Sequence, residues 1–394
     1  MVRPVVRGCP SLSAASLRFG PALATHRSDD PAGCPPTQTC LISGRLPAAG
    51  SALLRWATAE TVTLAWMDTR VLGKTGFKIS EVGFGGWAIG GSWGDVAEDD
   101  AVAALHAALD AGVTFIDTAD VYGDGRSERI IAKVLGERST EGVVVATKAG
   151  RRLDPHVAEG YTIENIEAFI DRSRANLRTD TLDLVQLHCP PTEVYYDPEL
   201  FDGLDGLVSG GKIRYYGVSV EKVEEALKAI EYPGVATVQI IFNAFRLRPA
   251  SLFFGQAAQR DVGVIARVPL ASGLLTGKMS ADSTFASDDH RNFNRHGESF
   301  DVGETFSGVP YEVGLDAVDR LRALVPEQAT MAQWALRWIL MHPEVSVVIP
   351  GAKNPDQATS IAAAADLPPL TEADMEQVEQ VYAELIAAHV HQRW

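Results

Sequence analysis

Four polar residues that could act together in catalysis end or follow short apolar segments of the sequence. Residues 113–128 read VTFIDTADVYGDGRSE, in which Asp117 interrupts a run of apolar and β-branched residues and Tyr122 lies beyond it. Lys148 directly follows VVVAT, and His188 directly follows LDLVQL. Each residue alone could be a strand-capping, loop or packing residue. Four of them in equivalent places favour a shared site.

The chemistry of these side chains suits proton transfer to or from an oxygen atom. A phenol has a pKa of about 10, which is too high for free acid or base work near neutrality. A lysine ammonium beside the phenol favours the phenolate, and a carboxylate can hold that lysine charged and oriented. An imidazole can hydrogen-bond a substrate oxygen. Together the four groups could protonate an alkoxide as hydride reaches a carbonyl carbon, or catalyse the reverse.

Eight short apolar segments alternate with helical patterns and would position these residues. The predicted strands are 82–84, 113–116, 143–147, 182–187, 213–218, 236–241, 262–268 and 345–349. Helices are predicted at 99–111, 127–136, 162–177, 198–210, 221–230, 249–260, 317–324, 331–342, 355–365 and 372–388. This alternation predicts an α/β fold, a (β/α)8 TIM barrel, with a hairpin at 69–80 before it. The functional residues of such barrels lie at the carboxyl ends of the strands.

An open, doubly wound sheet is the alternative fold. Residues 83–91, GFGGWAIGG, crowd glycines at the end of a strand. Their spacing is not that of a dinucleotide-binding turn opening into a helix, and no acidic residue ends a following strand at the expected distance. The barrel is therefore the favoured prediction.

Composition limits the classes of function. The chain has 394 residues, of which 46% are hydrophobic and 22% charged, which is typical of a globular protein. A net charge of −16 argues against binding to nucleic acid or an anionic membrane. No apolar run approaches the roughly 18 residues that span a bilayer. Cys189 is the one cysteine after residue 66, which fits a reducing, cytoplasmic setting.

The first 66 residues differ from the rest of the chain. They contain six arginines, no lysine, three acidic residues and three of the four cysteines. We interpret residues 1–66 as a disordered extension, either a start codon assigned too early or a targeting segment, and place the domain at 67–394. The early start codon is favoured, because Asp29-Asp30 and Pro35-Pro36 would interrupt an amphipathic targeting helix.

The motifs FIDTADVYGDGRSE, VATK, LVQLHCP, YYGVS, VQIIFN, VPLASGLLTGK and VVIPGAKNPDQ resemble those of the aldo-keto reductase superfamily, from residue 69 to residue 390. The resemblance implies a (β/α)8 barrel that binds a nicotinamide cofactor in extended form. It also implies a catalytic tetrad of Asp117, Tyr122, Lys148 and His188, with Tyr122 as the general acid.

The same resemblance implies a set of cofactor-binding residues, for NADPH with NADH as the alternative. Ser219 and Gln239 would hold the carboxamide, and Arg267 takes the place of an aromatic residue that stacks on the nicotinamide. The implied phosphate contacts are Leu270, Ser272, Gly273 and Lys278 after the seventh strand, and Gly351, Lys353 and Gln357 after the eighth. Two further residues differ from the family pattern. Val220 and Ile361 each stand where many members of the family have an asparagine.

Substrate contacts are expected from loops at the barrel mouth. Trp87, Trp93 and Tyr195 are the candidates. The long segment 278–311 follows the seventh strand and lacks helical or strand periodicity, and we expect it to lie over the mouth. Arg291, Asn292 and Arg295 would then face cofactor or substrate. The alternative is a solvated surface excursion.

These observations favour an NADPH-dependent enzyme that reduces a small-molecule aldehyde or ketone. Two alternatives stay open: an NAD(P)-dependent dehydrogenase of a sugar or secondary alcohol, and a nicotinamide-sensing regulatory subunit similar to the channel-associated members of the superfamily.

Overall fold

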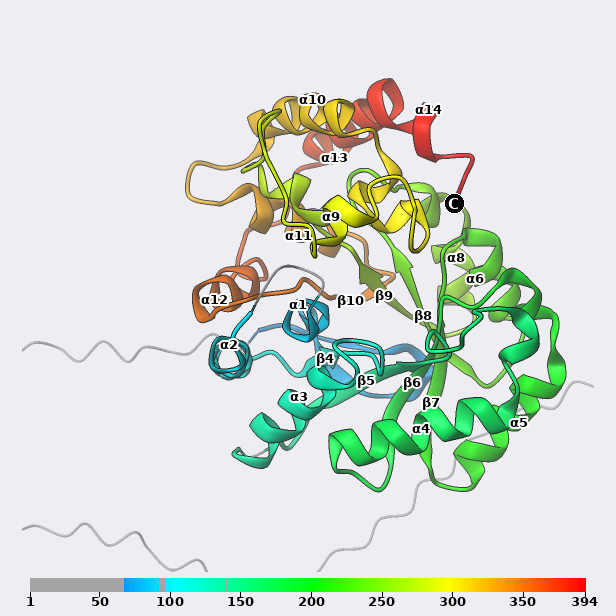
Figure 1. The fold of residues 1–394 in the computed structure, drawn as a ribbon. Coiled ribbons are helices and arrows are strands. Elements are labelled where there is room, and N and C mark those ends of the chain that lie inside the picture. Colours follow the sequence, from blue (N-terminus) through cyan, green and yellow to red (C-terminus); the bar gives the residue numbers. More distant parts are fainter. Residues whose placement is uncertain (1–66, 92–95, 139) are drawn as a thin grey trace, which may run out of the picture. The chain divides into compact units, whose positions relative to one another are not determined.

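Eight parallel strands form the centre of the protein (Figure 1). The computed structural model describes residues 67–91, 96–138 and 140–394. The strands pair in sequence order and are β3 (Phe84–Gly85), β4 (Phe115–Asp117), β5 (Val144–Ala149), β6 (Leu182–His188), β7 (Ile213–Ser219), β8 (Val235–Ile241), β9 (Gly263–Arg267) and β10 (Val345–Val348). The predictions for residues 1–66 lie outside the described residues.

Backbone hydrogen bonds between the first and last strands close the sheet. The amide of Gly83 donates to the carbonyl of Val348 at 2.8 Å, and the amide of Gly85 donates to that of Pro350 at 2.8 Å. Parallel bridges join Val82 to Val348 and Gly85 to Gly351. The predicted (β/α)8 barrel is therefore confirmed.

The predicted hairpin closes the amino-terminal end of the barrel. Strands β1 (Thr69–Val71) and β2 (Lys78–Ser80) pair antiparallel around a 3-10 turn. Leu72 and Ile79 from this hairpin join the apolar cluster that fills the barrel interior. Gly73 has a φ of +49°, and a β-carbon there would lie 2.2 Å from the amide nitrogen of Gly263. Only glycine allows this turn to approach β9 so closely.

Helices surround the sheet (Figure 1). They are α2 (Glu98–Asp110), α3 (Arg126–Gly136), α4 (Ile163–Leu177), α5 (Pro198–Ser209), α6 (Val223–Ala229), α7 (Arg248–Leu252), α8 (Phe254–Gln259), α10 (Tyr311–Leu321), α11 (Met331–Leu340), α12 (Pro355–Ala362), α13 (Glu372–Val381) and α14 (Ala387–Val390). The helix predicted at 249–260 is divided at Phe253, where Phe253 and Phe254 are both buried. A π-helical turn, Tyr382–Ile386, joins α13 to α14.

Two segments that were predicted as irregular contain helical turns. The glycine-rich stretch after β3 includes the short helix α1 (Trp87–Gly90). Segment 278–311 includes α9 (His290–Phe293) and 3-10 turns at Val302–Glu304 and Phe306–Gly308. A single helical turn is too short to show a hydrophobic periodicity in the sequence, especially where glycines and isolated polar residues interrupt it.

Segment 278–311 is fixed to the carboxyl ends of β8 and β9. Ser272 donates to the carbonyl of Glu304 at 3.1 Å, and Asn243 donates to the hydroxyl of Ser307 at 2.8 Å. The segment lies between α10 and the strand ends (Figure 1). It is therefore not a solvated excursion. Among the described residues, no helix combines the length and the hydropathy needed to cross a membrane.

Candidate active site

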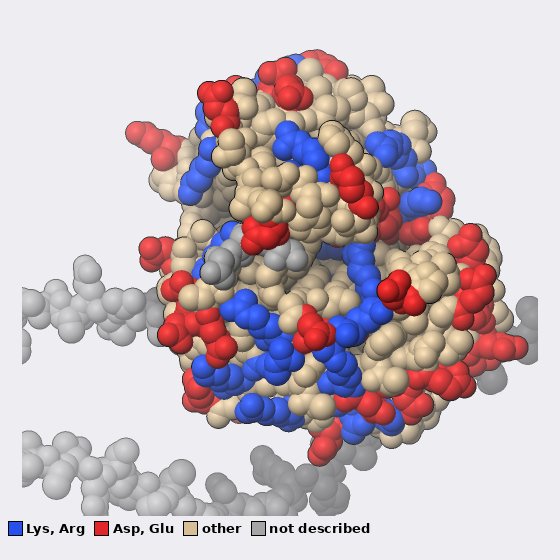
Figure 2. Space-filling view, viewed as in Figure 1, with Lys and Arg blue, Asp and Glu red and all other residues tan. Residues whose placement is uncertain are grey.

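A pocket of about 600 Å³ lies at the carboxyl ends of the strands and collects most of the predicted site residues. Figure 2 shows the molecule hollowed on this face, with Lys and Arg side chains along part of the rim. The predicted residues that line the pocket are Trp87, Asp117, Tyr122, His188, Ser219, Gln239, Arg267, Leu270, Ser272, Gly273, Lys278, Gly351, Lys353 and Gln357. The barrel thus brings together residues that lie between positions 87 and 357 of the sequence.

Asp117, Lys148 and Tyr122 form one hydrogen-bonded chain. Nζ of Lys148 lies 2.5 Å from Oδ1 of Asp117 and donates to the phenolic oxygen of Tyr122 at 3.2 Å. It also donates to the carbonyl of Thr118 at 2.9 Å. The side chains of Lys148 and Asp117 are only 1% and 3% exposed. The lysine is therefore held by three acceptors, one of which is the proposed acid.

The second carboxylate oxygen of Asp117 contacts two glutamine side chains of the barrel interior. Nε2 of Gln239 donates to Oδ2 at 2.7 Å, and Nε2 of Gln186 lies 3.4 Å from the same atom. The hydroxyl of Ser219 donates to Oε1 of Gln239 at 3.4 Å. Sequence reasoning missed Gln186. Its position could have indicated it. Gln186 lies two residues before His188, so both side chains are on the same face of a mostly apolar strand.

A close packing of glycines fixes the turn that carries Tyr122. A β-carbon on Gly90 would lie 2.6 Å from Cβ of Tyr122, and one on Gly123 would lie 2.0 Å from the carbonyl oxygen of Gly90. Helix α3 then begins at Arg126, after Gly125 with a φ of +79°. The glycine-rich stretch after Tyr122 thus leads into α3, near the helix predicted at 127–136, and α3 packs against α1. Trp87 covers Tyr122, with ring centroids 6.1 Å apart.

Burial and nearby charges set the protonation states of the tetrad. Burial raises the pKa of Tyr122, and the neighbouring Lys148 offsets only part of that rise. Burial lowers the pKa of Lys148, but Asp117 and Tyr122 outweigh it, so the net pKa is raised. Burial, with Arg151 and Lys148, holds the pKa of His188 well below its usual value. The site therefore contains a protonated phenol, a charged lysine and a neutral histidine near pH 7.

Arg267 is held by buried acidic groups instead of lying free in the pocket. Its Nη2 donates to Oε2 of Glu221 at 2.8 Å and to the carbonyl of Val220 at 2.9 Å, and its Nη1 lies 3.9 Å from Glu304. The Glu304 carboxylate compensates a positive charge that would otherwise disfavour an oxidised nicotinamide nearby. Burial raises the pKa of Glu221. The attraction of Arg151 and Arg267 outweighs burial at Glu304 and lowers its pKa.

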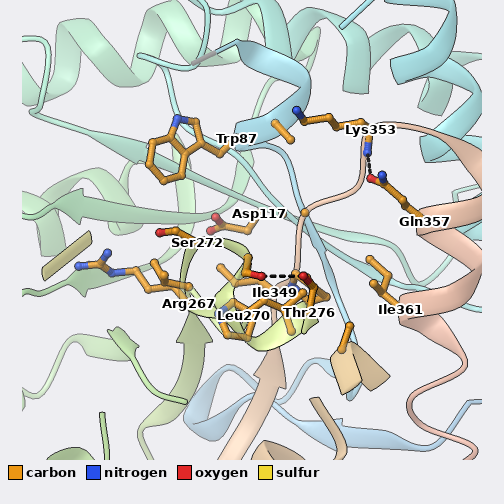
Figure 3. Close-up of a pocket in the computed structure, with 18 of the residues that line it drawn as sticks. Trp87, Asp117, Arg267, Leu270, Ser272, Thr276, Ile349, Lys353, Gln357 and Ile361 are labelled. Atoms are coloured by element: carbon orange, nitrogen blue, oxygen red, sulfur yellow. Dashed lines mark hydrogen bonds between the residues drawn. The ribbon is translucent and has the colours of Figure 1, made fainter. Parts of the chain in front are cut away.

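The far end of the pocket is rich in cationic groups. Burial, with the adjacent Arg291, lowers the pKa of Lys353. Nη2 of Arg291 also pairs with Oδ2 of Asp289 at 2.6 Å, so the positive charge here is only partly compensated, and a phosphate group would offset the remaining repulsion between Arg291 and Lys353. Oε1 of Gln357 accepts from the amide of Lys353 at 3.0 Å, and Asn354 caps the start of α12. Figure 3 places Lys353 and Gln357 together at one end and Trp87 and Arg267 toward the other.

An irregular turn after β9 lines the middle of the pocket. Ser272 and Gly273 have φ angles of +54° and +98°, and the hydroxyl of Thr276 donates to the carbonyl of Gly273 at 2.6 Å (Figure 3). Leu270 and Ile349 add apolar surface beside this turn. The pocket is thus lined by cations at one end, backbone in its middle and buried amide groups near the tetrad, which suits an extended nicotinamide dinucleotide.

The structure does not bring every predicted residue to the pocket. Tyr195 is fully buried, and its hydroxyl lies 3.5 Å from the carbonyl of Ser219, so the prediction of a substrate contact is wrong for this arrangement. Trp93 lies outside the described residues. Arg291 lines the pocket, but Asn292 is exposed. Arg295 packs over the Tyr311 ring at 4.6 Å and lines a separate, smaller cavity.

Val220 and Ile361, the other two departures from the family pattern, are apolar parts of the structure. Val220 is buried, and its carbonyl holds Arg267. Ile361 lines the pocket from α12. Neither side chain can replace the hydrogen bonds of an asparagine.

The sequence and the fold of this chain are similar to those of known proteins. A model of the aldo/keto reductase family matches residues 81–383. The aldo-keto reductase YhdN of Bacillus subtilis is 31% identical over 305 residues, covering 75% of this chain and 88% of YhdN. A glycerol dehydrogenase structure from Gluconobacter oxydans has a TM-score of 0.66 and 31% identity, covering 82% of this chain and 96% of that one. An aldo-keto reductase from Klebsiella pneumoniae, in complex with NADPH, is similar in fold, with a TM-score of 0.57 and 24% identity over 80% of this chain and 95% of that one.

Proposed function

The chain belongs to the aldo/keto reductase family, and we propose that it reduces an aldehyde or ketone to an alcohol with NADPH, with Tyr122 as the proton donor. The observation that carries this proposal is the buried chain of contacts from Asp117 through Lys148 to the phenolic oxygen of Tyr122 at the pocket wall. A phenol in contact with a charged lysine is equipped to release a proton to an alkoxide.

Each residue of the tetrad has a separate task. NADPH, when bound, would supply the hydride that reaches the carbonyl carbon. Tyr122 gives its proton to the carbonyl oxygen, and Lys148 stabilises the phenolate that is left. Asp117 keeps Lys148 charged and pointed at the phenol. His188 lies beside Tyr122, with ring centroids 5.9 Å apart, and its neutral imidazole can orient the substrate oxygen without adding a second acid.

The remaining pocket residues would hold the cofactor. Lys353 and Arg291 suit the 2′-phosphate that distinguishes NADPH from NADH, because both are cations at the far end of the pocket. Ser219 and Gln239 lie next to Asp117 and suit the carboxamide, since an amide side chain can both donate and accept. The NADPH complex of the Klebsiella relative supports this choice of cofactor.

A second candidate is the oxidative reaction on a hydroxyl compound, supported by the similarity to the Gluconobacter glycerol dehydrogenase. The same residues would serve, with the Tyr122 phenolate accepting the hydroxyl proton, and NADP⁺, when bound, would take the hydride from the carbinol carbon. Turnover of matched aldehyde and alcohol pairs in both directions at neutral pH separates the two candidates.

The test of the proposed function begins with cofactor binding. We expect NADPH fluorescence to change on titration with the purified protein, and NADPH to be consumed when an aldehyde or ketone is added. Replacing Lys353 with Met should weaken NADPH binding by at least about tenfold, the size of one lost charge-assisted contact. NADH binding should change little. Absence of NADPH binding would contradict the proposal, and binding without turnover on a broad carbonyl panel would favour a regulatory subunit.

A further inference from the structure

An arginine and a glutamate from distant parts of the chain meet at the catalytic end of the pocket. Nη1 of Arg151 donates to Oε1 of Glu304 at 2.9 Å and lies 3.4 Å from Nε2 of His188. Arg151 follows β5, three residues after Lys148, whereas Glu304 belongs to segment 278–311. Glu304 and His188 both line the pocket. The tetrad does not include either member of this pair.

The pair is held in place but keeps hydrogen-bonding capacity. Its side chains are 21% exposed for Arg151 and 6% for Glu304. The hydroxyl of Ser272 donates to the backbone carbonyl of Glu304, and this hydrogen bond holds the backbone at Glu304 in place. Only Nη1 of Arg151 has hydrogen bonds to the described residues, so N–H groups of this guanidinium can still donate.

The contact with His188 also limits what the imidazole can do. A guanidinium can only donate, so Nε2 of His188 accepts from Arg151 only in the tautomer with its proton on Nδ1, whereas donation to a substrate oxygen uses the tautomer with its proton on Nε2. Nδ1 is buried and has no hydrogen-bond partner among the described residues. Arg151 is therefore a donor immediately beside the place where a substrate oxygen would meet Tyr122 and His188.

The chemistry of the pair indicates a class of substrate. A hydroxyl group both donates and accepts, which matches a guanidinium N–H and a carboxylate oxygen side by side. A carboxylate on the substrate would be repelled by the negative charge of Glu304. An alkyl group would displace water from Arg151 and Glu304 without offering a hydrogen bond in its place. Trp87 and Phe300, with ring centroids 6.1 Å apart, add apolar surface for carbon–hydrogen faces.

We propose that Arg151 and Glu304 form a specificity-determining pair that selects carbonyl substrates bearing a hydroxyl next to the carbonyl group, such as hydroxyaldehydes and sugars. The inference rests on the proposed reduction of carbonyl compounds. It adds two residues to the site and narrows its substrate class.

The test compares three aldehydes of one carbon skeleton with NADPH as reductant: acetaldehyde, glycolaldehyde and glyoxylate. They differ only in a methyl, hydroxymethyl or carboxylate group beside the carbonyl. The measured quantity is the ratio of kcat/KM for glycolaldehyde to that for acetaldehyde, compared between variants so that differences in aldehyde hydration cancel. In Arg151→Met we expect this ratio to fall by about 10- to 100-fold, the effect of losing a hydrogen bond from a charged group.

The neighbouring Arg152 supplies the matched control. Its Nη1 pairs with the exposed Asp124, which also pairs with Arg172, whereas Nη1 of Arg151 contacts the pocket residues His188 and Glu304. Arg152→Met should leave the ratio within about twofold of the wild-type value. A folded Arg151→Met protein with an unchanged ratio would overturn the inference, even if both activities fell, because equal losses indicate a purely structural role.

A second variant keeps the inference testable if Arg151→Met does not fold. Glu304→Gln retains the shape of the side chain but removes the charge that excludes anions. We expect glyoxylate to gain at least about tenfold over glycolaldehyde in this variant. No gain would count against the pair. If the wild type reduces none of the three aldehydes nor any other carbonyl compound, the proposed function itself fails.

Discussion

Burial of Tyr122, more than the neighbouring Lys148, determines the protonation state of its phenol. From sequence we expected Lys148 to favour the phenolate. In the structure the pKa of Tyr122 is raised, because desolvation outweighs the attraction of Lys148. A phenol that stays protonated suits reduction, in which it must start as an acid. Lys148 then acts mainly on the phenolate that forms during the reaction.

This balance predicts a difference between the two reaction directions. Reduction needs the protonated phenol, which is present below the raised pKa of Tyr122 and lost only above it. Oxidation needs the phenolate, whose fraction below the pKa increases about tenfold per pH unit. We expect reductive kcat to lose little through Tyr122 between about pH 6 and 9, and oxidative kcat to rise across that range. Parallel pH profiles would contradict this assignment.

The buried pair of Asp117 and Lys148 should also be important for stability. Asp117→Asn leaves the Lys148 ammonium buried without its counter-ion, and we expect a loss of about 3–5 kcal/mol in the free energy of unfolding. Asp110→Asn is the control, because Asp110 pairs with Arg138 at the surface and should cost less than about 1 kcal/mol. Urea unfolding of the three proteins measures both values. Equal losses would contradict the importance of the buried pair.

At the scale of elements, the position of Tyr122 depends on the contact between α1 and the turn before α3. Gly90→Ala would place a methyl group 2.6 Å from Cβ of Tyr122, so the turn must shift. We expect kcat to fall by about tenfold or more and stability to fall by about 1–3 kcal/mol.

Gly136→Ala, at the end of α3, is the matched control for this substitution, because a β-carbon added there would have no atom of the described residues beyond its own helix within 4 Å. Steady-state kinetics and thermal unfolding of both variants provide the comparison. A Gly90→Ala enzyme with the kcat of the control would show that the turn tolerates displacement.

The elements that position the tetrad were readable from sequence, and the contacts between loops were not. Apolar runs followed by Asp117, Lys148 and His188 gave the strand order and the strand ends, because strand alternation with helices restricts the topology. The pairing of Arg151 with Glu304 spans 153 residues and depends on how segment 278–311 folds. The burial of Tyr195 depends in the same way on tertiary packing, which has no local sequence signal.

At the scale of the whole molecule, the last residue holds the segment that contributes Glu304. Trp394 is buried, and its Nε1 donates to Oδ1 of Asp301 at 2.8 Å. Its ring packs beneath Gly303 and Gly308, where an added β-carbon would lie 2.8 and 2.5 Å from ring atoms. The guanidinium of Arg246 lies over the same ring at 4.3 Å. Residues 301–308 are thereby anchored to the far end of the sequence.

This anchor predicts that a change far from the tetrad affects the pocket. Trp394→Ala should cost about 3–5 kcal/mol of stability and raise KM more than it lowers kcat, because Glu304 loses its support but the tetrad does not. Tyr196→Ala removes an exposed aromatic ring and serves as the control. Unfolding curves and kinetics of both variants test the expectation. A stable Trp394→Ala protein with unchanged KM would refute the anchoring role.

The most direct test of the whole account is the reductive turnover of Tyr122→Phe. This substitution removes one oxygen atom and preserves the ring that packs against Trp87. We expect NADPH binding to be retained and kcat for carbonyl reduction to fall by about 10²- to 10⁴-fold, the usual contribution of a positioned proton donor. A Tyr122→Phe protein that binds NADPH and keeps kcat within about twofold of wild type would contradict the assignment of Tyr122 as the acid.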